Sequence, residues 1–92
     1  MRCRARGDVD LASSAVLGTA LAEALAARPA RLVVDLAGVG FFDSSGLNVL
    51  LRLRLDAQAA GVPLTLAAPS AAVERVFDLT GAGDIFTVQA TA

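Results

Sequence analysis

The chain has 92 residues, a hydrophobic fraction of 55% and a net charge of −1. This length is enough for one domain, and the hydrophobic content excludes an intrinsically disordered chain, which combines low hydrophobicity with high net charge. Eight arginines balance nine acidic residues, which is not the basic excess of a nucleic-acid-binding protein. The sequence has no histidine, which excludes Ser-His-Asp and Cys-His catalysis and histidine-ligated zinc.

The compartment is indicated by cysteine content and hydropathy. The single cysteine, Cys3, has no intramolecular partner for a disulfide, which fits a reducing compartment. No apolar run reaches the roughly 18 residues that span a bilayer. Acidic residues precede and interrupt the apolar stretch from Ala12 to Ala27, which argues against a signal peptide. We therefore expect a cytoplasmic protein.

The N-terminal third predicts a strand and a helix. Residues 2–6 alternate weakly in polarity, as a short edge strand does, and residues 7–10 predict a turn. Asp10 stands just before an apolar periodicity that continues to about Ala27, so it is expected to cap a helix at its N-terminus. Pro29 ends that helix.

The middle of the chain predicts a buried strand and a longer helix. Residues 31–36 are nearly all apolar and β-branched, which is typical of a strand in a parallel sheet with helices on both sides. Residues 37–42 are interpreted as the connection that follows it. The second helix is predicted over residues 44–60, with Gly61 in the C′ position that glycine favours.

The last third continues the alternation. Residues 63–67 predict a third strand and residues 70–79 a third helix, followed by a glycine-containing break at residues 81–83 and a last strand at residues 85–88. The order β-α-β-α-β-α-β predicts an α/β domain with a mostly parallel or mixed sheet and right-handed crossovers. Residues 1–92 are expected to form this single domain.

The predicted helix over residues 44–60 has a wider apolar arc than packing on one sheet requires. One apolar stripe is expected to face the sheet: Val49, Leu50, Leu53, Ala57 and Ala60. A second stripe lies beside it: Leu47, Leu51 and Leu55. Neighbouring helices cover this second stripe, or part of it is exposed as a docking surface.

The junction before this helix carries the most informative residues: Asp43, Ser44, Ser45 and Gly46. Backbone N–H groups at the start of a helix lack helical partners and favour negative charge. A serine there is suited to carry a phosphate. The structural alternative is a simple cap, since serine caps helices well and glycine permits close approach of the backbone.

The segment Phe41-Phe42-Asp43-Ser44-Ser45-Gly46-Leu47, after a strand ending in Val-Asp-Leu, resembles the STAS domain of bacterial anti-sigma-factor antagonists. Residues 7–10, 61–64 and 73–81 resemble further segments of that domain, and the resemblance extends from about Gly7 to Val88. Against the family pattern, the N-terminal strands and the C-terminal helix are shortened or missing. The apolar surface left bare would favour a homodimer.

The resemblance implies a regulatory protein and not an enzyme. Such antagonists bind an anti-sigma factor that is also a serine kinase, and so free the sigma factor. The kinase, which holds the ATP, phosphorylates the antagonist and releases it, and a phosphatase resets it. The phosphorylated serine of the family is the one directly after the aspartate, which here is Ser44.

The resemblance also assigns the surrounding residues. Asp10 and Asp43 match the acidic positions that flank the phosphorylated serine, and Ser45 and Gly46 complete the motif. The expected partner-binding surface follows along the same helix: Leu47, Asn48, Leu51, Arg52 and Leu55. We expect no cofactor, no metal site, and no binding to nucleic acid or membrane.

Two other classes of function stay open at this point. Some STAS domains are docking subunits of ABC lipid-transport ATPases or anion transporters and have no phosphorylation switch. A serine hydrolase or nucleotide-binding enzyme is a third hypothesis, but the chain lacks the histidine and the phosphate-binding glycine loop that such enzymes use.

Overall fold

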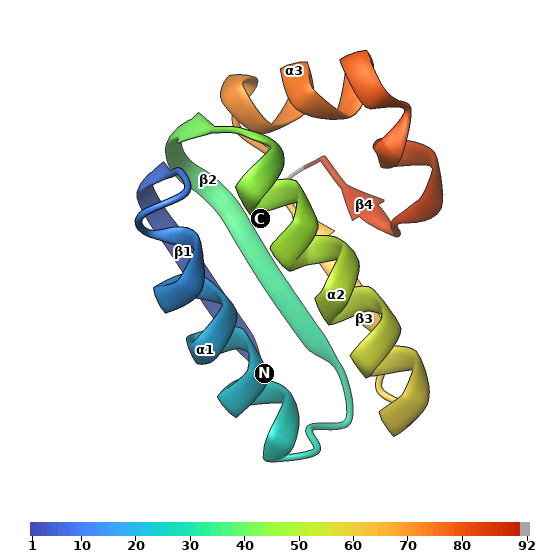
Figure 1. Cartoon of the computed structure of the whole chain (residues 1–92). Coiled ribbons are helices and arrows are strands. Elements are labelled where there is room, and N and C mark those ends of the chain that lie inside the picture. Colours follow the sequence, from blue (N-terminus) through green and yellow to red (C-terminus); the bar gives the residue numbers. More distant parts are fainter. Residues whose placement is uncertain (91–92) are drawn as a thin grey trace.

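A computed structural model of the chain describes residues 1–90, in which strands and helices alternate (Figure 1). The elements are β1 (Arg2–Val9), α1 (Ser14–Ala26), β2 (Leu32–Phe42), α2 (Ser44–Ala60), β3 (Leu64–Ala67), α3 (Ala71–Thr80), the short 3₁₀ helix η1 (Ala82–Ile85) and β4 (Val88–Gln89). This order confirms the predicted α/β class.

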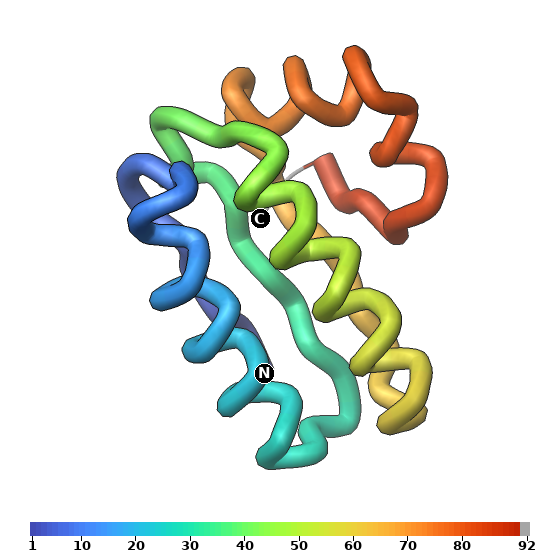
Figure 2. Tube along the Cα trace, viewed as in Figure 1, coloured from blue at the N-terminus to red at the C-terminus, as the bar shows by residue number. Residues whose placement is uncertain are grey.

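Within residues 1–90, the sheet has four parallel strands in the order β1-β2-β3-β4. Each right-handed crossover then moves one strand in the same direction, which places consecutive helices on one face of the sheet. Helices α1 and α2 do lie side by side over the same face (Figure 1), and the trace of β2 runs behind and between them (Figure 2). The expectation of helices on both sides is therefore wrong for these two helices.

Strands β1 and β2 are longer than predicted. The prediction of a turn at residues 7–10 and a connection at residues 37–42 is wrong, because these two segments pair with each other as far as Val9 and Phe42. The register shifts twice along the pair, between Arg4 and Arg6 and between Gly7 and Asp8. With these two irregularities, residues 37–42 of β2, which contain Gly38 and Gly40, stay paired with β1.

The C-terminal part departs most from the prediction. Helix α3 is capped by Ser70, whose hydroxyl accepts from the N–H of Val73 at 3.4 Å, and it ends at Gly81 in the left-handed conformation with φ of 73°. Residues 82–85 then form η1, so the predicted strand over residues 85–88 is wrong. The strand begins only at Val88, opposite Leu66 of β3.

Helix α2 matches the prediction in both bounds, and Gly61 ends it in the left-handed conformation with φ of 70°. Its residues Leu50 and Leu53 are buried against the sheet, where Val34 and Leu36 of β2 are fully covered. Val34 and Leu36 face the same side because successive side chains of a strand point to opposite faces of the sheet. The core therefore lies between the sheet and the pair of helices α1 and α2.

Asp35 is buried, and it points away from the core residues Val34 and Leu36 that flank it in β2. Its carboxylate accepts a hydrogen bond from the N–H of Ala37 at 3.0 Å and pairs with Arg2 at 3.1 Å. The Ala37 hydrogen bond, and then the Arg2 guanidinium, hold the pKa of Asp35 below its ordinary value. Asp35 is thus a structural acid that ties β1 to β2.

Candidate functional site

The carboxyl ends of β1 and β2 place the predicted site residues next to one another. Val9 pairs with Phe42, so the residues that follow, Asp10 and Asp43, leave neighbouring strands at the same edge of the sheet. Asp43 leads directly into α2, of which Ser44 is the first residue. The fold therefore brings together two segments that are far apart in the sequence.

Ser44 is exposed at the start of α2. Within residues 1–90 its hydroxyl has no hydrogen-bond partner, and its position is set by the backbone on either side. Asp43 has extended backbone angles, and its carboxylate accepts from the N–H of Ser45 at 2.9 Å. Asp43 is thus the N-cap of α2, and the Ser44 side chain is left free for a partner.

Asp10 has a capping role of its own. Its carboxylate accepts from the N–H of Ser13 at 3.0 Å, and the Ser13 hydroxyl accepts from the N–H of Asp10 at 3.0 Å. These two reciprocal bonds form a capping box, although the regular part of α1 begins at Ser14. The hydrogen bond from the Ser13 N–H is the main cause that lowers the pKa of Asp10 from its ordinary value. The carboxylate is thus engaged by Ser13, and a role toward Ser44 stays a prediction.

The start of α2 is held tightly against the sheet. Gly46 is buried, and a Cβ at this position would lie 2.5 Å from the ring of Phe42 and 2.8 Å from Val9. A side chain of any size would displace Phe42, Val9 or the start of α2. Gly46 therefore sets where the Ser44 backbone lies relative to the sheet.

The expected docking surface on α2 is only partly at the surface. Leu47 is 8% exposed and belongs to the core, so it offers little surface to a partner. Leu51 is half-buried, whereas Leu55 is 56% exposed. The outer side of the helix carries Asn48 and Arg52, both exposed, and Arg52 pairs with Asp56 at 3.5 Å.

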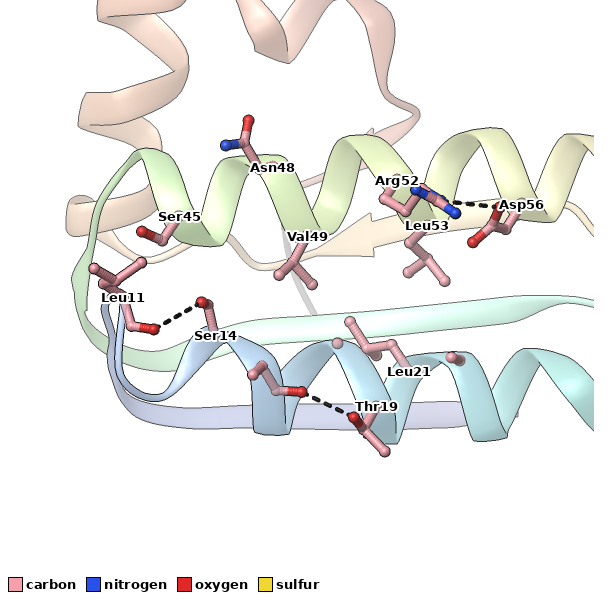
Figure 3. Close-up of a pocket in the computed structure, with 13 residues that line it drawn as sticks. Leu11, Ser14, Thr19, Leu21, Ser45, Asn48, Val49, Arg52, Leu53 and Asp56 are labelled. Carbon is pink, nitrogen blue, oxygen red and sulfur yellow. Dashed lines mark hydrogen bonds and ion pairs between the residues drawn. The ribbon is translucent and has the colours of Figure 1, made fainter.

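A groove of about 590 Å³ runs between α1 and α2, beside the start of α2 (Figure 3). Most of its exposed lining is apolar. Its walls are formed by residues of both helices and of the turn before α1, among them Leu11, Ser14, Gly18, Ser45, Val49 and Leu53. Ser45 lines the groove, but Ser44 does not.

The α1 wall of this groove was not predicted from the sequence. Ser14 is buried there, with its hydroxyl donating to the carbonyl of Leu11 at 3.3 Å. Gly18 stands where a Cβ would lie 3.7 Å from Val49 of α2, so the two helices approach closely. The small residues of α1 are the signal that would have pointed to this wall.

Residues 1–90, the part of the chain that the structure describes, contain no group of three or more histidine, cysteine or acidic residues placed to hold a metal ion. No helix among them has the length and apolar character needed to cross a membrane.

Comparisons with known proteins agree with this geometry. A protein-family model described as the Mlab STAS domain matches residues 1–88. The fold is similar to the crystal structure of a Thermotoga maritima protein described as a candidate anti-sigma factor antagonist, with a TM-score of 0.81 and 20% sequence identity. The similarity covers 91% of this chain and 73% of the other. At this level of identity it shows the fold.

Proposed function

Because the chain belongs to the STAS-domain family, we propose that it is an anti-sigma-factor antagonist controlled by phosphorylation of Ser44. In this proposal it acts by binding and has no catalytic activity of its own. Its partner in the cytoplasm is an anti-sigma factor with serine kinase activity, and a phosphatase resets the switch. The observation that supports this best is the exposed hydroxyl of Ser44 at the start of α2, which has no hydrogen-bond partner among residues 1–90.

The proposed docking surface continues from Ser44 along one side of α2. Helical periodicity places Asn48, Leu51 and Leu55 on the same side as Ser44. Leu55 supplies exposed apolar area, and Asn48 and Arg52 supply polar groups at its border. A partner that covers this side would contact Ser44, so a modification of Ser44 would change its binding.

A phosphate on Ser44 would act differently in the free and the bound protein. It would add a charge of about −1.5 to −2 at neutral pH. In the free protein, water and the N-terminus of α2 would stabilise this charge. Under a docked partner the phosphate would lose its hydration and lie next to the Asp43 carboxylate. A loss of about 3 kcal/mol in binding would weaken the complex by more than about a hundredfold.

The test is a phosphorylation assay with the cognate kinase and ATP. We expect one phosphate per chain, located on Ser44 by mass spectrometry, and its loss in Ser44→Ala. Ser45→Ala is the matched control, because it removes the neighbouring hydroxyl and leaves Ser44 in place. The kinase complex should form with the unmodified protein and dissociate after phosphorylation. Phosphate on Ser45, or no phosphate, would refute the assignment.

A second function is favoured by the family model, whose description names Mlab and not an antagonist. In this alternative the chain is a constant docking subunit of an ABC lipid-transport ATPase or an anion transporter, and Ser44 is only a helix residue. Purification from the native host distinguishes the two. A small ATP-binding kinase as the bound protein supports the switch, and a transporter ATPase whose binding is unchanged in Ser44→Asp supports the docking subunit.

A further inference from the structure

Strand β1 is the outermost strand on its side of the described sheet (Figure 1). The Val33 N–H of β2 donates to the Met1 carbonyl at 2.9 Å, so the backbone groups of Met1 point toward β2. Because these groups alternate in direction along a strand, the N–H and C=O of Arg4 point to the outer edge. The sheet formed by residues 1–90 has no strand beyond β1. An edge of this kind can receive a further strand.

The three arginines of β1 share one side of that strand. Arg2 and Arg4 reach Asp35 at 3.1 and 3.9 Å, so they lie on the side of the sheet that faces away from α1 and α2. Arg4, Arg6 and Asp35 line one shallow hollow of about 250 Å³. Gly38 leaves space for the Arg6 stem there, since a Cβ on Gly38 would lie 3.2 Å from the Arg6 Cγ. All three arginines are exposed.

This side of β1 has an excess of positive charge. The three arginines lie beside a single carboxylate, that of Asp35. Arg6 makes no hydrogen bond or ion pair within residues 1–90, so its guanidinium is available. The basic segment ends at Asp8, which is exposed next to the core residue Val9. Because guanidinium groups bind carboxylates through paired hydrogen bonds, this side of β1 is suited to an acidic partner.

The spacing of the arginines is that of an extended chain. Alternate residues of a strand are about 6.6 Å apart and point to the same side. A strand added beside β1 would therefore place every second side chain next to an arginine. We propose that the outer edge of β1 binds an extended acidic segment of another protein. The backbone of that segment extends the sheet, and its alternate carboxylates pair with the arginines at positions 2, 4 and 6.

The same charges disfavour a second copy of this chain as the occupant. In an antiparallel pair of two β1 strands centred on Ala5, Arg4 of one copy lies opposite Arg6 of the other. Like charges directly opposite each other destabilise a strand pair. Arginine on the edge strand thus opposes pairing between identical chains and favours an acidic segment.

Fluorescence anisotropy of a labelled peptide with three Glu-Thr repeats tests the proposal, using the full chain at low salt. One added strand buries less than the roughly 800 Å² per partner of a standard interface, so the dissociation constant should be on the order of tens of micromolar. Arg6→Glu should raise this constant by at least about tenfold, because it places like charges together. Arg75→Glu makes the same change at an exposed residue of α3 and should alter it less than about twofold.

A second peptide separates an added strand from attraction by charge alone. It has three glutamates in one block followed by three threonines, so its composition and charge are the same. It should bind at least about fivefold more weakly, because only every second side chain of an added strand faces the arginines.

Hydrogen exchange followed by NMR reads the backbone directly. The alternating peptide should slow exchange of the Arg4 N–H and leave the Arg75 N–H unchanged. Circular dichroism confirms that each variant is folded. No binding of the alternating peptide, equal binding of both peptides, equal weakening by Arg6→Glu and Arg75→Glu, or unchanged exchange at Arg4 would each overturn the proposal. The kinase takes no part in these measurements, so their result is independent of the proposed switch at Ser44.

Discussion

Gly46 of α2 lies directly against the aromatic ring of Phe42, the last residue of β2. A Cβ on Gly46 would come within 2.5 Å of the Phe42 ring, a distance that real side chains do not adopt. The first turn of the helix that begins at Ser44 therefore leaves no room for a side chain at position 46. This contact links the packing of the core to the position of the candidate phosphorylation site.

Gly46→Ala is expected to destabilise the protein by about 1–3 kcal/mol, the usual range for an overpacked core. The added methyl group must displace either Phe42 or Val9, and both are buried. Urea unfolding followed by circular dichroism measures the change in the free energy of unfolding.

Gly18→Ala is the matched control for this prediction. A Cβ on Gly18 would be 3.7 Å from Val49, which is ordinary van der Waals contact. Because glycine inside a helix is unfavourable, this variant should gain about 0.5–1 kcal/mol. Opposite signs at the two positions are the expected result. An unchanged stability of Gly46→Ala would mean that α2 moves away from Phe42 without cost.

Asp43 and Ser44 are adjacent, but we expect them to contribute very differently to stability. Asp43→Ala removes the hydrogen bond to the Ser45 N–H and should cost about 1 kcal/mol. Ser44→Ala removes an exposed hydroxyl and should stay within about 0.5 kcal/mol of the wild type. The free energies of unfolding of the two variants test this directly.

Asp43→Asn serves as the control, since an asparagine oxygen caps nearly as well as a carboxylate. It should recover most of the stability that Asp43→Ala loses. If Ser44→Ala were the more damaging variant, Ser44 would be a structural residue, and any loss of partner binding in that variant would need another explanation. If Ser44→Ala is as stable as expected, a loss of phosphorylation in this variant reports on the missing hydroxyl and not on unfolding.

Local patterns predicted the helices better than the strands. The bounds of α2 follow from Asp43 and Gly61, which cap the helix from positions next to its ends. Residues 37–42 contain Gly38 and Gly40, and glycine is unfavourable in strands, so a loop was the natural interpretation. Pairing with β1 keeps residues 37–42 in the sheet despite these glycines. The pattern of one strand does not say which other strand it pairs with.

The candidate site also combines features that local sequence predicts with features that depend on the rest of the fold. The position of Asp43 and Ser44 at the start of α2 could be predicted from the motif at the strand-to-helix junction, because it is set by neighbours in the chain. The burial of Leu47 could not be predicted, since the apolar period of α2 does not say which stripe the rest of the fold covers. The groove was also missed because it depends on α1 lying beside α2, which follows from the strand order and not from either helix alone.

The stability of the protein should fall in acid partly through Asp35. Its pKa is lowered in the folded protein, first by the Ala37 N–H and then by Arg2. A lowered folded-state pKa means that the stabilisation is fully present above the ordinary value of 3.8 and is lost as the pH falls through the folded-state pKa. Asp35→Asn should therefore lower the melting temperature at neutral pH and make its decline below pH 3.8 less steep.

Melting temperatures from pH 7 to pH 2 compare this variant with Asp78→Asn. Asp78 is exposed on α3 and has no hydrogen bond or ion pair within residues 1–90, so its variant should follow the wild type at every pH. Parallel acid profiles for the wild type and Asp35→Asn would show that the link between β1 and β2 does not depend on the charge of this carboxylate. We expect the two melting-temperature profiles to converge only at low pH. Protonation of Asp35 then removes from the wild type the charge interaction that Asp35→Asn already lacks.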